Sequence, residues 1–149
     1  MNKTILLVED NESDEKLTLL AFRGCGVAND VVVVRDGAEA LDYLFAEGVH
    51  VSSVPRDLPA VVLLDVNLPR VGGHEVLRRL RADPRTGALP VVMLTSSKEE
   101  EDIARSYALG ANAYVRKPVD FKEFAAAVKA LGLFWLLLNE RPASIRGRS

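Results

Sequence analysis

Short runs of apolar residues recur along the chain, separated by segments in which polar residues are frequent. Valine and leucine make up most of these runs, which lie at residues 5–8, 31–34, 60–65, 90–95 and 113–115. Runs this short and this rich in β-branched residues are typical of strands buried on both faces of a sheet. We therefore predict five buried strands, the third of which ends in the carboxylate of Asp65.

Between these runs, apolar residues recur at the three- and four-residue spacing of amphipathic helices. The first helix is expected to begin near Ser13, the third opens at Gly72 and Gly73, and residues 97–100 form a capping box for the fourth. A last helix follows Asp120 and continues to about residue 138. The residues predicted to face the core are Leu17, Leu20 and Ala21 in the first helix, Leu41, Leu44 and Phe45 in the second, Val76, Leu77 and Leu80 in the third, and Ile103, Ala104 and Tyr107 in the fourth.

Five strands alternating with five helices predict an α/β fold. This alternation favours a doubly wound parallel sheet with helices on both faces, and the flavodoxin-like strand order 2-1-3-4-5 is the common arrangement for five strands. The 149 residues are expected to form a single domain, with a core at about residues 3–130 and a helix extension and polar tail at 131–149. Residues 48–59 lose all periodicity and are expected to form a surface loop.

Composition narrows the functional classes. The net charge of −2 lacks the basic excess of a nucleic-acid-binding protein. The longest apolar run, residues 133–138, is far shorter than the ~20 residues that span a bilayer, and residues 1–3 lead directly into the first strand without a signal peptide. A single cysteine, Cys25, excludes an internal disulfide. We therefore expect a cytoplasmic protein that binds neither nucleic acid nor membrane.

Acidic residues follow the first and third strands, which lie side by side in the predicted order. Glu9, Asp10 and Asp65 are therefore expected within a few ångströms of one another, where they raise one another's pKa values unless a cation neutralises them. Oxygen ligands suit Mg²⁺, and the backbone carbonyl of Asn67 completes the predicted set. The alternative is that Glu9 and Asp10 cap the first helix or are simply solvated.

Two further polar side chains end the remaining strands at the same edge. Lys117, at the end of the fifth strand, can reach back over the sheet towards Asp65, and Thr95 ends the fourth strand with a hydroxyl donor. With the carboxylates they form a phosphoryl-transfer site, in which Asp65 attacks phosphorus and forms an acyl phosphate. Lys117, Thr95 and Mg²⁺ would offset the charge on the phosphoryl oxygens. A lysine taken alone is usually a solvated charge, and the alternative for Thr95 is a cap of the following helix.

These residues, in this order on these strand ends, resemble the receiver domain of two-component response regulators. The matching elements are Glu9-Asp10, Leu64-Asp65, Leu68-Pro69, Gly72-Gly73, Thr95-Ser96, residues 108–111 and Lys117-Pro118. The resemblance implies that Asp65 accepts a phosphoryl group from a phosphohistidine of a sensor histidine kinase. It also implies Mg²⁺ at the three acids and the Asn67 carbonyl, and a cis peptide bond between Lys117 and Pro118.

The same resemblance implies a signalling module rather than an enzyme, with slow self-catalysed phosphorylation and dephosphorylation. A conformational switch would run through Thr95 and Tyr114, because a phosphoryl group adds roughly −1.5 to −2 charge and new acceptor oxygens. Thr95 would move to bond one of these oxygens, leaving space for the Tyr114 ring to turn inward. The alternative for Tyr114 is a plain core aromatic.

Two features extend beyond a minimal receiver domain. The loop at residues 48–59 and the apolar end of the last helix resemble the single-domain regulators that partner bacterial and cyanobacterial phytochromes, so the expected kinase is a bacteriophytochrome in a light-sensing pathway. Residues 133–138 are all apolar and cannot all face one side of a helix. Phe134, Trp135 and Leu138 are therefore expected in a symmetric homodimer interface with the fourth helix and fifth strand. The alternative is that the tail folds back over them.

Two other functions are weighed against the signalling module. A small phosphohydrolase with Asp65 as nucleophile would need a second acid two residues later, where the chain has Asn67. A flavin or nucleotide binder would need a glycine-rich phosphate loop after the first strand, where Glu9 and Asp10 would instead repel a phosphate. The sequence therefore favours a phospho-accepting module without an attached output domain.

Overall fold

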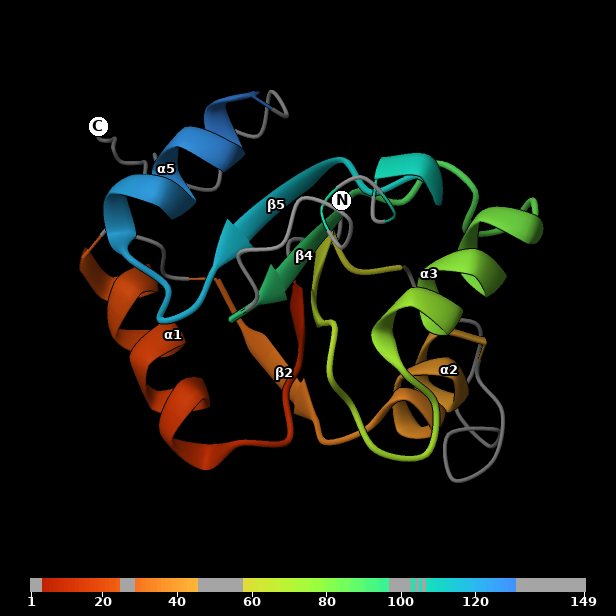
Figure 1. Ribbon diagram of the computed structural model, residues 1–149, viewed down its shortest axis with the longest axis horizontal. Helices are drawn as coiled ribbons and strands as arrows, with labels where there is room; N and C mark the ends of the chain where they lie inside the picture. Colours follow the sequence, from red (N-terminus) through yellow and green to blue (C-terminus); the bar gives the residue numbers. More distant parts are fainter. Residues whose placement is uncertain are drawn as a thin grey trace, which may run out of the picture.

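The apolar runs form one parallel sheet. The computed structural model describes residues 4–24, 29–45, 58–96, 103, 105 and 107–130. In chain order its elements are β1 (Ile5–Val8), α1 (Glu12–Gly24), β2 (Val31–Val34), α2 (Gly37–Phe45), β3 (Val61–Asp65), α3 (Gly73–Ala82), β4 (Val91–Thr95), β5 (Ala113–Arg116) and α5 (Phe121–Ala130). The strands pair in the order β2-β1-β3-β4-β5 (Figure 1), which confirms the predicted flavodoxin-like fold.

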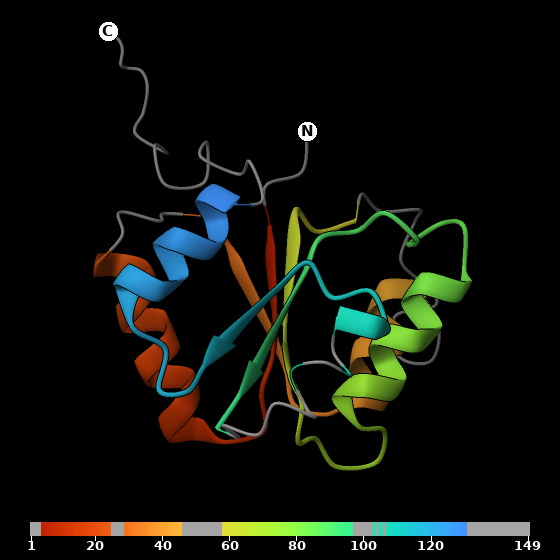
Figure 2. The same cartoon turned by 45° about the horizontal axis from the view of Figure 1, so that its top comes forward.

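The sheet separates two hydrophobic cores, because successive residues of a strand point to opposite faces. Ile5 and Leu7 of β1 pack in the first core with α1 and α5, whereas Leu6 and Val8 pack in the second core with α2 and α3. Figure 2 shows the two helical layers on either side of the sheet. A polar side chain in such a strand would lose its water without gaining a partner, which explains the uninterrupted apolar runs.

The first two helices begin at side-chain caps close to the ends of the preceding strands. Oδ1 of Asn11 accepts a hydrogen bond from the backbone N–H of Asp14 at 2.9 Å, and α1 begins one residue before the predicted Ser13. Oδ1 of Asp36 accepts the backbone N–H of Glu39 at 2.8 Å at the start of α2. Such caps satisfy N–H groups that have no partner within the helix, and they fix where each helix leaves the sheet.

The buried face of α1 differs from the predicted one. The buried residues of α1 are Thr18, Ala21 and Phe22. The Phe22 ring packs on Phe124 of α5 with their centroids 4.7 Å apart. Because this aromatic contact takes the side of α1 that faces the first core, Leu17 and Leu20 lie on the adjacent face and are 42% and 54% exposed. The prediction that these two leucines form the buried stripe was therefore wrong.

Helical residues also precede β5. Residues 103, 105, 107 and 108 are helical, and Ile103 is half-buried. Tyr107 was predicted to face inward but is 50% exposed. That prediction was wrong because Leu109 and Ala111, at the end of this segment, pack against the second core instead. Tyr107 therefore lies at the surface.

Some predictions fall on residues outside the described ranges. These are Cys25, the loop at 48–57, the capping box at 97–100, Ala104, and the extension at 131–149 with Phe134, Trp135 and Leu138. The division of the chain into a core and an extension therefore stays a prediction. Within the described residues, no helix combines the length and the apolar character that a membrane span requires.

α3 begins against the end of β3. The N–H of Gly73 donates to the carbonyl of Val66 at 3.0 Å, and a Cβ on Gly73 would lie 2.2 Å from the carbonyl oxygen of Asp65. Glycine is therefore required where the helix approaches this strand. At the adjacent Gly72, the nearest neighbour of a Cβ would be 3.9 Å away and φ is −69°, so a side chain fits.

We expect Gly73→Ala to lower the free energy of unfolding by about 2–3 kcal/mol, because the added methyl group forces backbone atoms apart. The matched substitution one residue earlier, Gly72→Ala, should change it by less than about 1 kcal/mol. Urea denaturation followed by circular dichroism measures both. Equal destabilisation by the two substitutions would contradict the close approach of α3 to Asp65.

Candidate functional site

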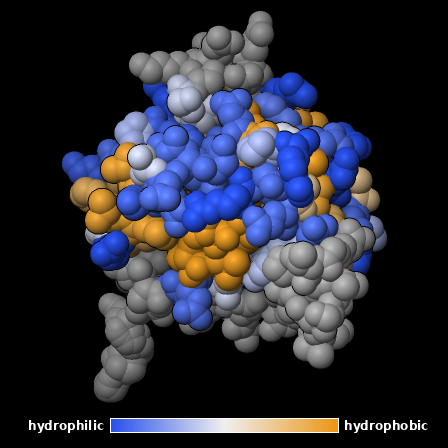
Figure 3. All heavy atoms as spheres, turned by 90° about the horizontal axis from the view of Figure 1, so that it is seen from below, coloured by the Kyte–Doolittle hydropathy of each residue, from blue (hydrophilic) through white to orange (hydrophobic). Residues whose placement is uncertain are grey.

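Three carboxylates meet where β1 and β3 end. Val8 pairs with Leu64 in the parallel ladder, so the residues that follow them emerge at the same edge of the sheet. Glu9 and Asp65 are buried and Asp10 is exposed. One carboxylate oxygen from each of the three lies within 4.8 Å of the others. Figure 3 shows the molecule from below the view of Figure 1, where hydrophilic residues lie beside a hydrophobic patch near the centre of the face.

Glu9 is held in an environment that disfavours its charge. Burial and the neighbouring Asp65 carboxylate raise the pKa of Glu9 to about 7, although Lys117 acts in the opposite direction. Oε2 of Glu9 also accepts the backbone N–H of Asn11 at 3.2 Å. Without a cation, Glu9 therefore takes up a proton near neutral pH.

Lys117 joins the carboxylates to the end of β5. Its backbone N–H donates to the carbonyl of Thr95 at 2.8 Å, and its peptide bond to Pro118 is cis, as the resemblance implied. Nζ of Lys117 lies 2.9 Å from Oδ2 of Asp65, and 3.1 and 3.2 Å from the two carboxylate oxygens of Glu9. The structure thus places the ammonium against Asp65, where the strand order predicted it.

Burial alone would lower the pKa of the Lys117 ammonium. The hydrogen bonds and charges of the surrounding carboxylates outweigh burial, and the pKa lies above its ordinary value. Lys117 therefore remains a cation throughout the physiological pH range and supplies a fixed positive charge beside Asp65.

A third carboxylate reaches the same ammonium. Oδ2 of Asp14, in the first turn of α1, lies 2.7 Å from Nζ of Lys117. No role for Asp14 followed from the sequence, because acidic residues are common in the first turn of a helix on electrostatic grounds alone. The sequence feature that could have indicated this contact is the position of Asp14 four residues after Asp10, on a helix that begins at the site.

The loop after β3 fixes one side of the Asp65 carboxylate. The backbone N–H of Asn67 donates to Oδ1 of Asp65 at 3.0 Å, and the N–H of Val66 donates to the carbonyl of Leu94 at 2.9 Å. Asn67 itself is exposed. Asp65 therefore accepts from the loop through one oxygen and from Lys117 through the other. Ligation of a cation by the Asn67 carbonyl stays a prediction.

The two residues of the predicted switch lie on adjacent strands. Thr95 ends β4 and is buried, and Tyr114 of β5 is half-buried against the second core. The register pairs Thr95 with Arg116 and Met93 with Tyr114. Because side chains alternate along a strand, residues two positions apart point to the same face. Thr95 and Tyr114 therefore belong to the same face of the sheet, in successive pairs of that face. The rearrangement of these side chains stays a prediction.

The donor set of the site fits a hard divalent cation. Carboxylate oxygens are the ligands that Mg²⁺ prefers, and Glu9, Asp10 and Asp65 converge closely enough to share one ion. Once Glu9 is ionised, three carboxylates are opposed by the single charge of Lys117, and this negative balance favours cation binding. These three residues would hold the ion, and it would offset charge on the oxygens of a bound phosphoryl group.

Comparison with known proteins agrees with this geometry. The family model described as the response regulator receiver domain matches residues 5–129. The chain belongs to this family. This receiver domain is 36% identical over 142 residues to the response regulator Rcp1 of Synechocystis sp., with 95% of each chain covered. It is 41% identical over 139 residues to the probable methanogenesis regulatory protein FilR2 of Methanothrix harundinacea, covering 93% of this chain and 86% of that relative.

Solved structures of such regulators match the fold of this receiver domain. The bacteriophytochrome response regulator RtBRR is 53% identical, with a TM-score of 0.84 over 98% of this chain and 88% of that one. The Mn²⁺-bound form of Rcp1 is 36% identical, with a TM-score of 0.73 over 95% of this chain and 99% of that one. The five-stranded sheet and its helices are therefore those of a receiver domain.

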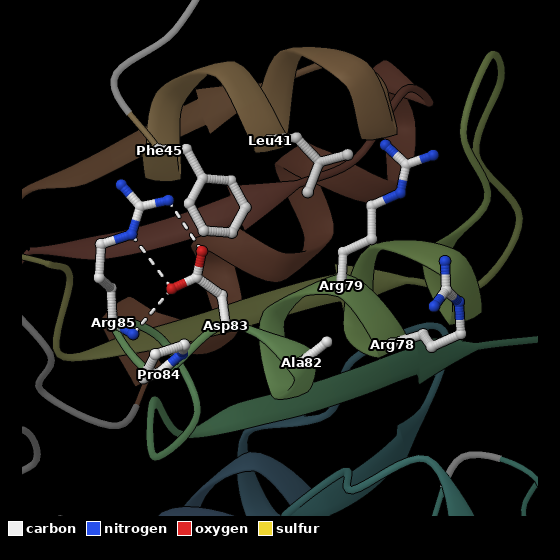
Figure 4. A pocket seen from close by; sticks show the side chains of 8 residues that line it. All are labelled: Leu41, Phe45, Arg78, Arg79, Ala82, Asp83, Pro84 and Arg85. Carbon is white, nitrogen blue, oxygen red and sulfur yellow. Dashed lines mark hydrogen bonds and ion pairs between the residues drawn. The ribbon is translucent and has the colours of Figure 1, made fainter.

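The receiver domain also has a pocket of about 400 Å³ on its α2–α3 side. Figure 4 shows its lining, which consists of Leu41, Phe45, Arg78, Arg79, Ala82, Asp83, Pro84 and Arg85. The Arg85 guanidinium pairs with Asp83 at 2.8 Å and lies 4.9 Å from the centroid of the Phe45 ring. Arg78 and Arg79 both pair with Glu75. The lining contains none of the predicted site residues, and its cationic groups already have carboxylate partners.

We expect the stability of the cation-free receiver domain to fall as the pH rises from about 4.5 to about 7. Folded Glu9 keeps its proton up to a pKa of about 7, against an ordinary value of 4.5, so the folded state binds more protons than the unfolded state in this window. The fall should amount to a few kcal/mol and be absent in Glu9→Gln. Urea denaturation in a chelator at several pH values measures the difference between the two proteins.

In excess Mg²⁺, the stability of the wild type relative to Glu9→Gln should instead rise with pH. The cation binds the ionised Glu9 carboxylate, so its stabilising effect grows as the pH rises. A constant difference between wild type and Glu9→Gln from pH 4.5 to pH 7 in the chelator would contradict the raised pKa.

Proposed function

We propose that this chain is a phospho-accepting response regulator, in which Asp65 receives the phosphoryl group of a phosphohistidine on a sensor histidine kinase. The observation that carries the proposal is the position of the Lys117 ammonium, 2.9 Å from Oδ2 of Asp65 and within 3.2 Å of Glu9. A lysine held at a carboxylate nucleophile provides a donor for the phosphoryl oxygens at the point where their charge develops.

The transfer is a displacement at phosphorus. A carboxylate oxygen of Asp65 forms a bond to phosphorus while the bond from phosphorus to the histidine nitrogen breaks, and the imidazole leaves with its electron pair. Asp65 needs no general base, because a carboxylate is already the nucleophilic form. Lys117 and Thr95 are the proposed partners of the phosphoryl oxygens. Slow self-catalysed phosphorylation and dephosphorylation belong to the same proposal.

Mg²⁺ is the proposed cofactor, held by Glu9, Asp10, Asp65 and the backbone carbonyl of Asn67. The convergence of three carboxylates supports a divalent cation, and Rcp1 is a relative whose solved form is Mn²⁺-bound. Mg²⁺ satisfies the same oxygen ligands and commonly assists phosphoryl transfer.

Phosphorylation is proposed to switch the protein through Thr95 and Tyr114. A phosphoryl group on Asp65 brings charge and acceptor oxygens to the carboxyl edge of the sheet. Thr95 ends the strand next to β3, and Tyr114 lies one pair further back on the same face. A shift of the Thr95 hydroxyl towards the phosphoryl group would free space for the Tyr114 ring.

The similarity to RtBRR supports a bacteriophytochrome as the kinase, since RtBRR is a bacteriophytochrome response regulator. We propose accordingly that the chain acts in the cytoplasm, in a light-sensing phosphorelay, without binding nucleic acid or membrane. The proposal that it is a homodimer rests on the apolar sequence of residues 133–138.

Neither alternative function gains support from the site. A phosphohydrolase would use an acid at position 67, whereas Asn67 supplies a backbone donor to Asp65. A flavin or nucleotide site would need free backbone N–H groups after β1, but the N–H of Asn11 is bonded to Glu9 and that of Asp14 to Asn11.

Incubation with Mg²⁺ and acetyl phosphate should give a protein that carries one phosphoryl group, detected by intact mass. Asp65→Asn should abolish the adduct, since an amide cannot replace the attacking carboxylate. Asp83→Asn is the matched control, because Asp83 pairs with Arg85 at the far end of α3 and should leave the adduct unchanged. An adduct that persists in Asp65→Asn would refute the assignment, and rapid turnover without any adduct would favour a phosphohydrolase.

Size-exclusion chromatography with light scattering should show a dimer for the wild type and a monomer for Trp135→Glu with Leu138→Glu. Burying two carboxylates in an apolar interface without partners is strongly unfavourable. Lys16→Glu is a matched charge change on the exposed side of α1, and should leave the dimer intact. A monomeric wild type at high micromolar concentration would exclude the dimer.

A further inference from the structure

Asp14 touches the functional lysine from outside the predicted site. Its Oδ2 lies 2.7 Å from Nζ of Lys117, a shorter distance than that from Nζ to either Glu9 or Asp65. The Asp14 side chain is 28% exposed. It therefore meets the ammonium from the solvent side, while Glu9 and Asp65 meet it from the interior.

Asp14 is held in place by a short chain of hydrogen bonds. Its backbone N–H donates to Oδ1 of Asn11 at 2.9 Å, and the backbone N–H of Asn11 donates to Oε2 of Glu9 at 3.2 Å. Glu9 in turn accepts from Lys117. The start of α1 and the lysine are thus bound to the same carboxylate, which fixes Asp14 at the distance that its contact with Lys117 requires.

The partners of Lys117 fall into two groups. Glu9 and Asp65 belong to the set that converges on a cation position, whereas Asp14 does not. A divalent cation bound by Glu9 and Asp65 would be ligated by the same carboxylates that accept hydrogen bonds from the Lys117 ammonium. The cation also repels the positive charge of the ammonium. Among the described residues that pair with Lys117, Asp14 is then the one whose carboxylate is not shared with the cation.

We propose that Asp14 is a positioning residue, whose carboxylate keeps the Lys117 ammonium beside Asp65 while a divalent cation occupies Glu9 and Asp65. This inference deepens the proposed function and rests on it. In this role Asp14 accepts one N–H group of the ammonium on the solvent side. The other N–H groups then remain for Asp65 and its phosphoryl group. It also reduces the competition between Lys117 and the cation for the same oxygens.

The competing explanation is that Asp14 serves only the helix, as an acid near its positive end. Glu12 provides a control for this explanation, because it lies in the same first turn and carries the same charge. Glu12 pairs with the exposed Lys16 and not with Lys117. Glu12→Gln therefore reproduces the loss of charge and the helix effect without the contact to the site.

Binding of Mn²⁺ tests the inference without any phosphoryl chemistry. The affinity is measured from the electron paramagnetic resonance signal of free Mn²⁺ for wild type, Asp14→Asn, Glu12→Gln, Lys117→Gln and the double variant of Asp14 and Lys117. Asp14→Asn should weaken Mn²⁺ binding roughly three- to tenfold more than Glu12→Gln. Without the Asp14 carboxylate, the ammonium pairs only with Glu9 and Asp65, which are also ligands of the cation. In the Lys117→Gln background, Asp14→Asn should have no larger effect than Glu12→Gln.

The rate of adduct formation gives a second readout. At saturating Mg²⁺ and acetyl phosphate, Asp14→Asn should form the phosphoryl adduct roughly tenfold more slowly than wild type, and Asp14→Glu should restore most of the rate. Equal Mn²⁺ affinities for Asp14→Asn and Glu12→Gln would overturn the role of Asp14. A wild type that forms no adduct would instead overturn the proposed function. The Mn²⁺ affinities of the single and double variants would still show whether Asp14 acts through Lys117.

Discussion

The pairing of one largely buried ammonium with carboxylates from separate parts of the fold is the interaction on which this site depends. Nζ of Lys117 contacts Glu9 after β1, Asp65 at the end of β3 and Asp14 in α1. Charges removed from water are tolerated only when they are paired closely, and here the Lys117 ammonium compensates the carboxylates that it contacts. The same pairing leaves an excess of negative charge, which favours the binding of a cation.

The parallel sheet makes this pairing possible. Lys117 and Glu9 are separated by 108 positions in the sequence, yet both follow strands whose carboxyl ends share one edge. Local hydrogen bonds then fix the loops at that edge. The Asn11 side chain accepts one at the start of α1, and the backbone N–H of Asn67 donates one to Asp65. Because Gly73 lets α3 close directly onto β3, the backbone that carries Asp65 is supported from the side of the second core as well.

The strands and their order were predictable because burial on both faces leaves a strong signal, as in the four apolar residues of β1, all of which are buried. The meeting of Glu9, Asp65 and Lys117 followed from that order, and the resemblance to receiver domains added their roles. The face of α1 was not predictable, since the hydropathy of Leu17 and Leu20 says nothing of the Phe22–Phe124 contact that decides it. Asp14 and the raised pKa of Glu9 also depend on tertiary contacts that no local pattern reports.

The depth at which Lys117 lies determines how the site responds to its ionic surroundings. Its side chain is 10% exposed, whereas that of Lys16, which pairs with Glu12 on the surface, is 72% exposed. Dissolved ions screen charges that are surrounded by water and screen buried pairs much less. The electrostatic arrangement around Asp65 is therefore largely independent of the salt concentration of the surrounding solution, while contacts such as Lys16 with Glu12 weaken as salt is added.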